Sequence, residues 1–171
     1  GYYDARSFVV ADTKNPKWQR KLIEMADRTI ELGGNSVFYD QLGYGEKTGI
    51  WDVHKEFPIP ELCIIADKAN ALKMAHDYID NKDKNLAIGT EHITDVTSQY
   101  VDYVHSVTDF SPASCFIEWF RYTFPEIIIT DRNVDGDEPN IEWLMNKNVL
   151  LGVRNNLQIY RLRGLISETP L

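Results

Sequence analysis

The sequence is poor in cysteine and in positive charge. Only Cys63 and Cys115 occur among 171 residues, too few for a disulfide framework, so we expect buried free thiols. The chain has 18 Lys and Arg against 26 Asp and Glu, a net charge of −8, and contains no basic run. Because binding to phosphates requires clustered cationic side chains, this composition argues against a nucleic-acid partner.

Long apolar runs and several catalytic motifs are also missing. No stretch approaches the ~20 apolar residues of a membrane-spanning helix, and the first residues do not show the pattern expected of a signal peptide. We find no phosphate-binding glycine loop, G-x-S-x-G elbow, Cys-x-x-Cys or H-E-x-x-H. No cofactor is expected. Asp40, His54, Glu91 and His92 carry donor atoms for a divalent metal, but no ligand spacing singles out a metal site.

What the sequence does contain is typical of one globular domain covering residues 1–171. Hydrophobic residues make up 43% and charged residues 26% of the chain. Aromatic residues, at 12%, suit either a well-packed core or the stacking of sugar rings. The chain begins with Gly1, so we expect either a processed N-terminus or a piece of a longer protein.

The first half of the chain repeats one pattern twice. A helical spacing of apolar residues starts at Asn15-Pro16 and ends at Gly33-Gly34, and a short apolar strand over residues 36–39 then leads to Asp40. After a glycine-rich loop, a second helix over residues 62–79 precedes a strand over residues 86–90, which leads to Glu91. Each predicted strand therefore ends on a carboxylate.

The second half continues the alternation less regularly. It predicts a helical turn over residues 94–101, strands over 103–107 and 127–130, a helix over 141–152, and a strand or helix over 157–162. Strands that alternate with helices of 10–15 residues indicate βα units. The sequence therefore predicts an α/β fold with a parallel sheet.

Asp40 and Glu91 are the candidate catalytic pair. In parallel α/β folds functional groups collect at the carboxyl ends of strands, and a retaining glycosidase holds its two carboxylates ~5 Å apart. One carboxylate then attacks the sugar while the other, in a drier setting, protonates the leaving oxygen. The alternative is that each acid caps a helix or forms a structural ion pair.

Further residues around this pair are candidates for substrate contacts. They flank the two carboxylates, lie in the long loop after the first strand, follow an aromatic segment, or end a third strand. These residues are Tyr39, Gln41, Trp51, His54, His92, Arg121, Asp131 and Arg132. Strand alternation turns Tyr39 and Gln41 away from Asp40 unless the strand end is bulged, and a structural ion pair is the default for Asp131 and Arg132.

Several short motifs resemble an uncharacterised family of bacterial glycoside hydrolases that is distantly similar to the endo-α-N-acetylgalactosaminidase group. The segment NSVFYDQ (35–41) is similar to the G-(V/I)-(F/Y)-x-D-Q pattern around the nucleophile, and Gly89-Thr90-Glu91 resembles the strand of the proton donor. Segments 16–19, 121–126 and 150–154 resemble other blocks of that family. The resemblance implies a (β/α)8 TIM barrel, Asp40 as nucleophile, Glu91 as acid/base, retention of configuration and a carbohydrate substrate. By analogy it also implies a secreted or periplasmic protein.

The length bears on this reading, because a complete barrel takes ~250 residues and eight strands. We expect the chain to cover only the C-terminal half to two-thirds of a barrel, completed by missing N-terminal residues or by a partner chain. Two other functions stay open. One is a non-catalytic carbohydrate-binding or structural barrel fragment, and the other is a metal-assisted sugar isomerase or aldolase.

Overall fold

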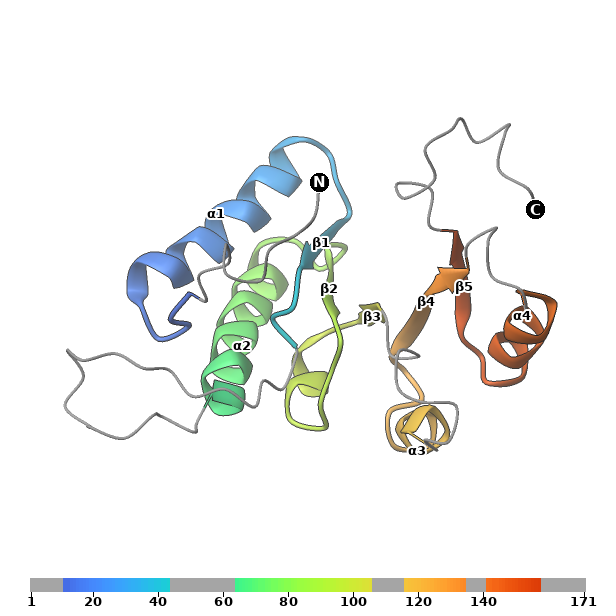
Figure 1. Cartoon of the computed structure of the whole chain (residues 1–171). Helices are drawn as coiled ribbons and strands as arrows, with labels where there is room; N and C mark the ends of the chain where they lie inside the picture. Colours follow the sequence, from blue (N-terminus) through green and yellow to red (C-terminus); the bar gives the residue numbers. More distant parts are fainter. Residues whose placement is uncertain (1–10, 44–63, 106–115, 135–140, 158–171) are drawn as a thin grey trace, which may run out of the picture.

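The computed structural model describes residues 11–43, 64–105, 116–134 and 141–157, which form a five-stranded, all-parallel β-sheet flanked by helices (Figure 1). The elements in chain order are α1 (Pro16–Glu31), β1 (Ser36–Tyr39), α2 (Ile64–Lys82), β2 (Ala87–Glu91), the 3-10 helix η2 (Thr97–Tyr100), β3 (Tyr103–His105), α3 (Phe116–Thr123), β4 (Ile128–Val134), α4 (Ile141–Leu150) and β5 (Arg154–Leu157). The prediction of an α/β fold with a parallel sheet is confirmed.

Helix α1 forms where the sequence signals predict it. The side chain of Asn15 accepts a hydrogen bond from the backbone N–H of Lys17, and Pro16 occupies the first turn. At the other end Gly33 has a φ of 74°, a left-handed conformation that glycine adopts without strain. The turn after α1 leads directly into β1.

The five strands lie in sequential order, β1-β2-β3-β4-β5, and every neighbouring pair is parallel. Right-handed crossovers between sequential strands place all connecting helices on the same face of a sheet. In Figure 1 the helices accordingly follow one another in an arc around the strands, α1 and α2 on the left, α3 below and α4 on the right.

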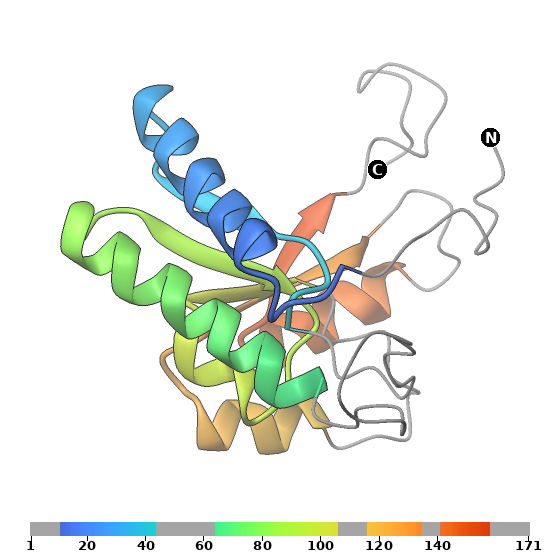
Figure 2. The same cartoon turned by 90° about the vertical axis from the view of Figure 1, so that its left-hand side faces the viewer.

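Burial alternates along the strands as this arrangement requires. One set of alternate strand residues faces the helices and forms the core with side chains of α1, α2 and α3. These buried residues are Leu22, Ala26, Val37, Tyr39, Leu72, Ala75, Ile79, Ile88, Val104, Phe120 and Ile129. Helix α4 covers the same face, because Asn148 donates to the carboxylate of Asp131 in β4, two residues after Ile129. Figure 2 shows α1 and α2 side by side over this face.

The other set of alternate strand residues forms the second face of the sheet, which no described helix covers. We call it the open face. Its residues are Ser36, Phe38, Ala87, Gly89, Glu91, Tyr103, His105, Ile128, Thr130, Arg154 and Asn156. Phe38 is 37% exposed there, and Arg154 and Asn156 are also exposed. The sheet therefore has one face in the core and one without a covering layer.

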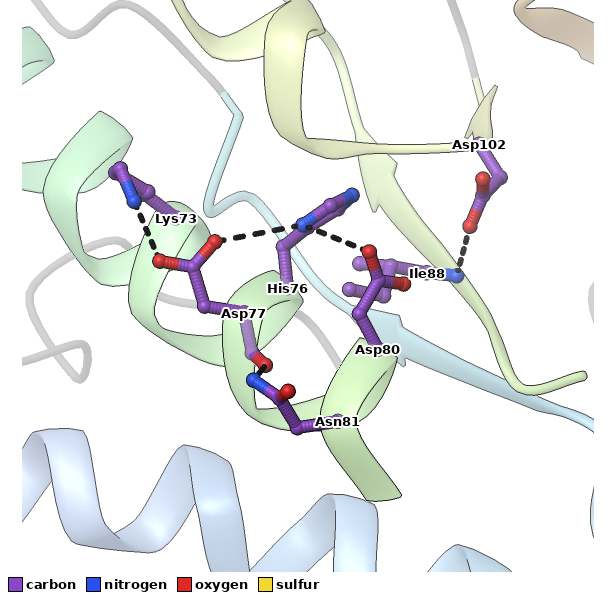
Figure 3. Close-up of polar contacts among 7 residues, drawn as sticks. All are labelled: Lys73, His76, Asp77, Asp80, Asn81, Ile88 and Asp102. Atoms are coloured by element: carbon purple, nitrogen blue, oxygen red, sulfur yellow. Dashed lines mark hydrogen bonds and ion pairs between the residues drawn. The ribbon is translucent and has the colours of Figure 1, made fainter. Parts of the chain in front are cut away.

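Two polar arrangements around α2 and β2 are structural. The side chain of Asp102 accepts the backbone N–H of Ile88 at 2.8 Å, which joins the loop before β3 to the start of β2 (Figure 3). On α2, Nδ1 of His76 lies 3.7 Å from the carboxylate of Asp77 and 3.8 Å from that of Asp80. None of the described helices combines the length and the apolar character needed to cross a membrane.

Two predicted elements differ from the structure in kind or extent, and one strand was not predicted. The helical turn expected over residues 94–101 is the short 3-10 helix η2, and the strand expected over 127–130 extends to Val134. The segment 157–162, expected to be strand or helix, lies outside the described residues except for Leu157. The last described strand is β5, which starts at Arg154 and was not predicted there. Its residues Arg154, Asn155 and Asn156 are polar, so it has no hydrophobic alternation to reveal it.

Candidate functional site

The strand register brings the two candidate catalytic carboxylates to the same edge of the sheet. Tyr39 of β1 is the register partner of Thr90 of β2, and both strands run in the same direction. Asp40 and Glu91 follow these partners directly, so they occupy neighbouring positions at the carboxyl ends of adjacent strands. Glu91 is 4% exposed, whereas Asp40 is exposed to solvent.

The backbone is strained immediately after each carboxylate. Gln41 and His92 both have a φ of 55°, and they are the only non-glycine residues with positive φ in the described part of the chain. Left-handed backbone is uncommon for residues with a Cβ, and such strain tends to cluster at functional sites. Here it turns the chain sharply over the edge of the sheet at Asp40 and Glu91.

Thr90 connects the two strand ends and fixes the turn that carries Asp40. Its hydroxyl donates to the carbonyl of Tyr39 and accepts the N–H of Gly43, both at 2.8 Å. The hydroxyl of Thr97 donates to the carbonyl of Gly43 at 3.0 Å. A Cβ at Gly43 would lie 2.4 Å from the carbonyl oxygen of His92, so only glycine fits this close approach.

A buried lysine supports the same turn from α2. The ammonium of Lys68 donates to the carbonyl of Gln41 at 3.1 Å, and the residue is only 4% exposed. The position after Asp40 is therefore held from β2 by Thr90 and from α2 by Lys68. This support positions the carboxylate, because the backbone on its C-terminal side cannot move freely.

A hollow of about 300 Å³ opens on the open face, beside this edge. Its lining consists of Phe38, Tyr103, His105, Thr130 and Asn156. His105 is the register partner of Glu91 on one side and of Thr130 on the other. The hollow therefore adjoins the strand end that carries Glu91.

Aromatic rings form one wall of the hollow. Phe38 stacks on Tyr103 with centroids 6.2 Å apart and an angle of 24° between the ring planes, and His105 stands edge-on to Phe38 at 6.0 Å. Gly89 creates the space for Tyr103, because a Cβ there would lie 2.0 Å from a ring carbon. The hydroxyl of Ser36 donates to that of Tyr103 at 2.7 Å and holds the ring across β2.

The ring of His105 is held on the open face by a side chain of the neighbouring strand β4. The hydroxyl of Thr130 lies 3.3 Å from the carbonyl of Val104 and 2.8 Å from Nδ1 of His105. Because a hydroxyl can donate or accept, this 2.8 Å contact joins β3 to β4 with either tautomer of the ring.

Two residues expected to bind substrate lie on the other face. Tyr39 is 2% exposed and its hydroxyl donates to the carbonyl of Leu22 at 2.8 Å, and burial raises the pKa of the phenol. Asp131 is fully buried and accepts from Asn148 at 2.9 Å. The expectation of substrate contacts is wrong for both, because strand alternation directs them into the helix-covered core.

Arg121 is also placed away from the carboxylates. Its guanidinium donates to the backbone carbonyls of Ile127 at 2.8 Å and Leu151 at 3.2 Å, and also to that of Gly152. These carbonyls precede β4 and β5, so Arg121 lies at the amino-terminal edge of the sheet. Asp40 and Glu91 lie at the opposite edge, and the expected contact with them or with substrate is wrong.

The remaining expected residues divide into two groups. Gln41 and His92 lie at the edge beside the carboxylates and stay candidates. Trp51 and His54 lie outside the described residues, as does the side chain of Arg132. Phe38, Tyr103, His105, Thr130 and Asn156 were not expected to bind ligand, although Phe38 shares the strand parity of Asp40, which is a signal the sequence does contain.

Within the described ranges, no three His, Cys, Asp or Glu side chains gather as a metal site requires. A comparison with protein-family models finds no match, and a comparison with curated proteins finds none either. The functional argument therefore rests on the geometry of the site.

Proposed function

We propose that this chain is the catalytic part of a retaining glycoside hydrolase, with Asp40 as nucleophile and Glu91 as acid/base. The observation that carries the proposal is the placement of both carboxylates at neighbouring positions of adjacent parallel strands. Adjacent strands are about 4.8 Å apart. Neighbouring strand ends therefore bring the two backbones close enough for the ~5 Å carboxylate separation that a retaining mechanism requires.

The different exposure of the two acids supports the division of roles. Glu91 is buried, which is the drier of the two settings and the one that suits the acid/base of a retaining pair. Asp40 is exposed, so an anomeric carbon can reach its oxygen. After the glycosyl-enzyme forms, Glu91 in its ionised form takes a proton from the attacking water.

The proposed fold is the C-terminal half to two-thirds of a (β/α)8 barrel. The sequential strand order and the placement of the helices on one face support it, since a barrel repeats this arrangement eight times. The open face then corresponds to the barrel interior, and the remaining strands come from outside the described residues, either in a longer chain or in a partner chain. A carbohydrate is the expected substrate, and secretion or export to the periplasm accords with such an enzyme.

Substitution of the two carboxylates tests the mechanism. Asp40→Asn removes the nucleophile, so we expect hydrolysis of every aryl glycoside that the chain cleaves to fall by at least about a thousandfold. Glu91→Gln removes the proton donor. We expect a loss of about a hundredfold or more with poor leaving groups and a much smaller loss with 2,4-dinitrophenyl glycosides, which need little protonation.

Asp95→Asn, at an exposed position beyond the edge of β2, is the matched control and should retain full activity. The proposal fails if Asp40→Asn and Glu91→Gln cleave as well as the parent chain. Binding of sugars without turnover by any variant would favour the carbohydrate-binding alternative. Loss of turnover on adding a chelator would favour the metal-assisted isomerase or aldolase.

A further inference from the structure

The hollow on the open face combines an aromatic wall with uncharged polar groups. Phe38 is 37% exposed and presents its ring to the hollow beside Tyr103. His105, Thr130 and Asn156 complete the part of the lining that the structure describes, and none of these five residues is Lys, Arg, Asp or Glu. Such a lining has no formal charge for an ionic ligand when the histidine is neutral, and it offers both donors and acceptors.

This combination matches the two surfaces of a sugar ring. A pyranose has an apolar face of C–H groups, which stacks on aromatic rings, and an edge of hydroxyls, which both donate and accept hydrogen bonds. Asn156 and the imidazole of His105 supply groups of this kind. The volume of about 300 Å³ lies at the lower end of the range for small-molecule sites, which fits one ring rather than an extended chain.

The lining is fixed before any ligand arrives. Tyr103 lies across Gly89, where a Cβ would be 2.0 Å from the ring, and the hydroxyl of Ser36 donates to its hydroxyl. The ring of His105 is held by the 2.8 Å contact between Nδ1 and Thr130. Groups that are already in place lose little conformational entropy on binding, so a weakly contacting monosaccharide can still be held.

We infer that this hollow is the subsite for the sugar ring that undergoes cleavage, with the ring stacked on Phe38 and its hydroxyls bonded to Asn156 and His105. The inference rests on the proposed function, because the register partnership of His105 with Glu91 places the hollow next to the acid/base carboxylate. It adds the chemical class of the ligand, a neutral pyranose, and the residues that select it.

Binding is measured with the full 171-residue chain carrying Asp40→Asn, so that turnover does not interfere. The probes are the α- and β-methyl glycosides of galactose, glucose and N-acetylgalactosamine, followed by saturation-transfer NMR and calorimetric titration. We expect at least one probe to bind. Adding Phe38→Ala should raise the dissociation constant of that probe about five- to tenfold. Phe38→Leu should raise it nearly as much, because leucine restores apolar volume but has no flat ring face.

Trp119→Ala is the matched control. Trp119 is a 71% exposed aromatic residue on α3, away from the open face, and its removal should leave the affinity unchanged. Circular dichroism of each variant separates lost binding from lost folding. Asn156→Ala should also weaken binding of the same probe. It should leave the core unchanged, because Asn156 is exposed on β5.

The outcomes separate this inference from the proposed function. If folded Phe38→Ala and Asn156→Ala bind as tightly as the parent, or if none of the six probes binds, the subsite is refuted even where Asp40 and Glu91 prove catalytic. If the probes bind and both substitutions weaken their binding while the parent chain cleaves no aryl glycoside, the hollow is a pyranose-binding site, its role in cleavage is refuted, and the hydrolase proposal fails.

Discussion

Tyr39 and Asp40 are adjacent in the chain but face opposite sides of the sheet. The side chain of Tyr39 points into the core, where its hydroxyl donates to the carbonyl of Leu22 in α1. Asp40 follows at the solvent-exposed edge. One residue therefore anchors the strand to a helix while the next is available for chemistry, and the two roles can be separated by substitution.

Tyr39→Phe should remove the anchor and change the pH dependence of stability. Near neutral pH we expect a loss of about 1 kcal/mol in unfolding free energy, from the missing hydrogen bond to Leu22. The pKa of the phenol is raised in the folded chain by burial, whereas the unfolded chain ionises near pH 10. This contribution is therefore complete below about pH 10 and is lost as the pH rises towards the folded pKa.

Urea unfolding of Tyr39→Phe at neutral and alkaline pH checks both effects. The variant should lose less stability than the parent chain between about pH 9 and pH 11. Tyr122→Phe is the control, because Tyr122 is 87% exposed and should behave like the parent. Parallel alkaline profiles for parent and Tyr39→Phe would contradict the assignment.

At single positions, the sequence predicted backbone placement better than side-chain direction. The two strand-end carboxylates follow from the apolar strands before them, and the structure does place them at one edge. The direction of Arg121 does not follow, because a long flexible side chain reaches whichever carbonyls lie near it. The hollow could not be predicted from the sequence either, because Tyr103 reaches Phe38 only through the space that Gly89 provides.

At the scale of elements, Arg121 joins α3 to the starts of β4 and β5. Its guanidinium donates to the carbonyls of Ile127 and Leu151, and to that of Gly152. Carbonyls in such turns have few other partners, and one planar cation with five donors satisfies several of them. The position of both strands relative to α3 therefore depends on this side chain.

Arg121→Met should destabilise the fold by about 2–3 kcal/mol, because hydrogen bonds from a charged donor are lost while the apolar stem is kept. Arg28→Met is the control, since Arg28 pairs only with Glu31 at an exposed site on α1. Chemical denaturation measures both variants. At temperatures where Arg121→Met is folded, its KM should equal that of the parent chain, and a raised KM would restore the substrate-binding role expected from the sequence.

Elements were predictable where their burial pattern is simple. Helix α1 has a cap, a proline at its first turn and a terminal glycine, and β1 is a short apolar run between clear breaks. Strand β5 was not predicted because its residues Arg154, Asn155 and Asn156 are polar and its pairing with β4 includes an irregularity between Asp131 and Val134. Residues 154–157 form a strand because they pair with β4, and a local sequence pattern does not reveal such pairing.

For the molecule as a whole, the two faces of the sheet are unequal. The helix-covered face is packed with aliphatic side chains, whereas the open face carries Phe38, Tyr103 and Ile128 without a covering layer among the described residues. Apolar surface of this kind usually marks an interface or a binding groove. In the barrel proposal further strands enclose it.

The barrel proposal predicts that residues 1–171 alone leave this face accessible. An apolar fluorescent dye such as anilinonaphthalene sulfonate should therefore bind the folded chain, and Ile128→Lys should reduce its fluorescence by placing a charge at the centre of the open face. Val149→Lys is the matched control, because Val149 is 71% exposed on α4 and should leave dye binding unchanged. If Ile128→Lys and Val149→Lys bind as much dye as the parent chain, other residues of the chain already cover the face. The sheet would then be a closed unit of its own, with no need for additional strands.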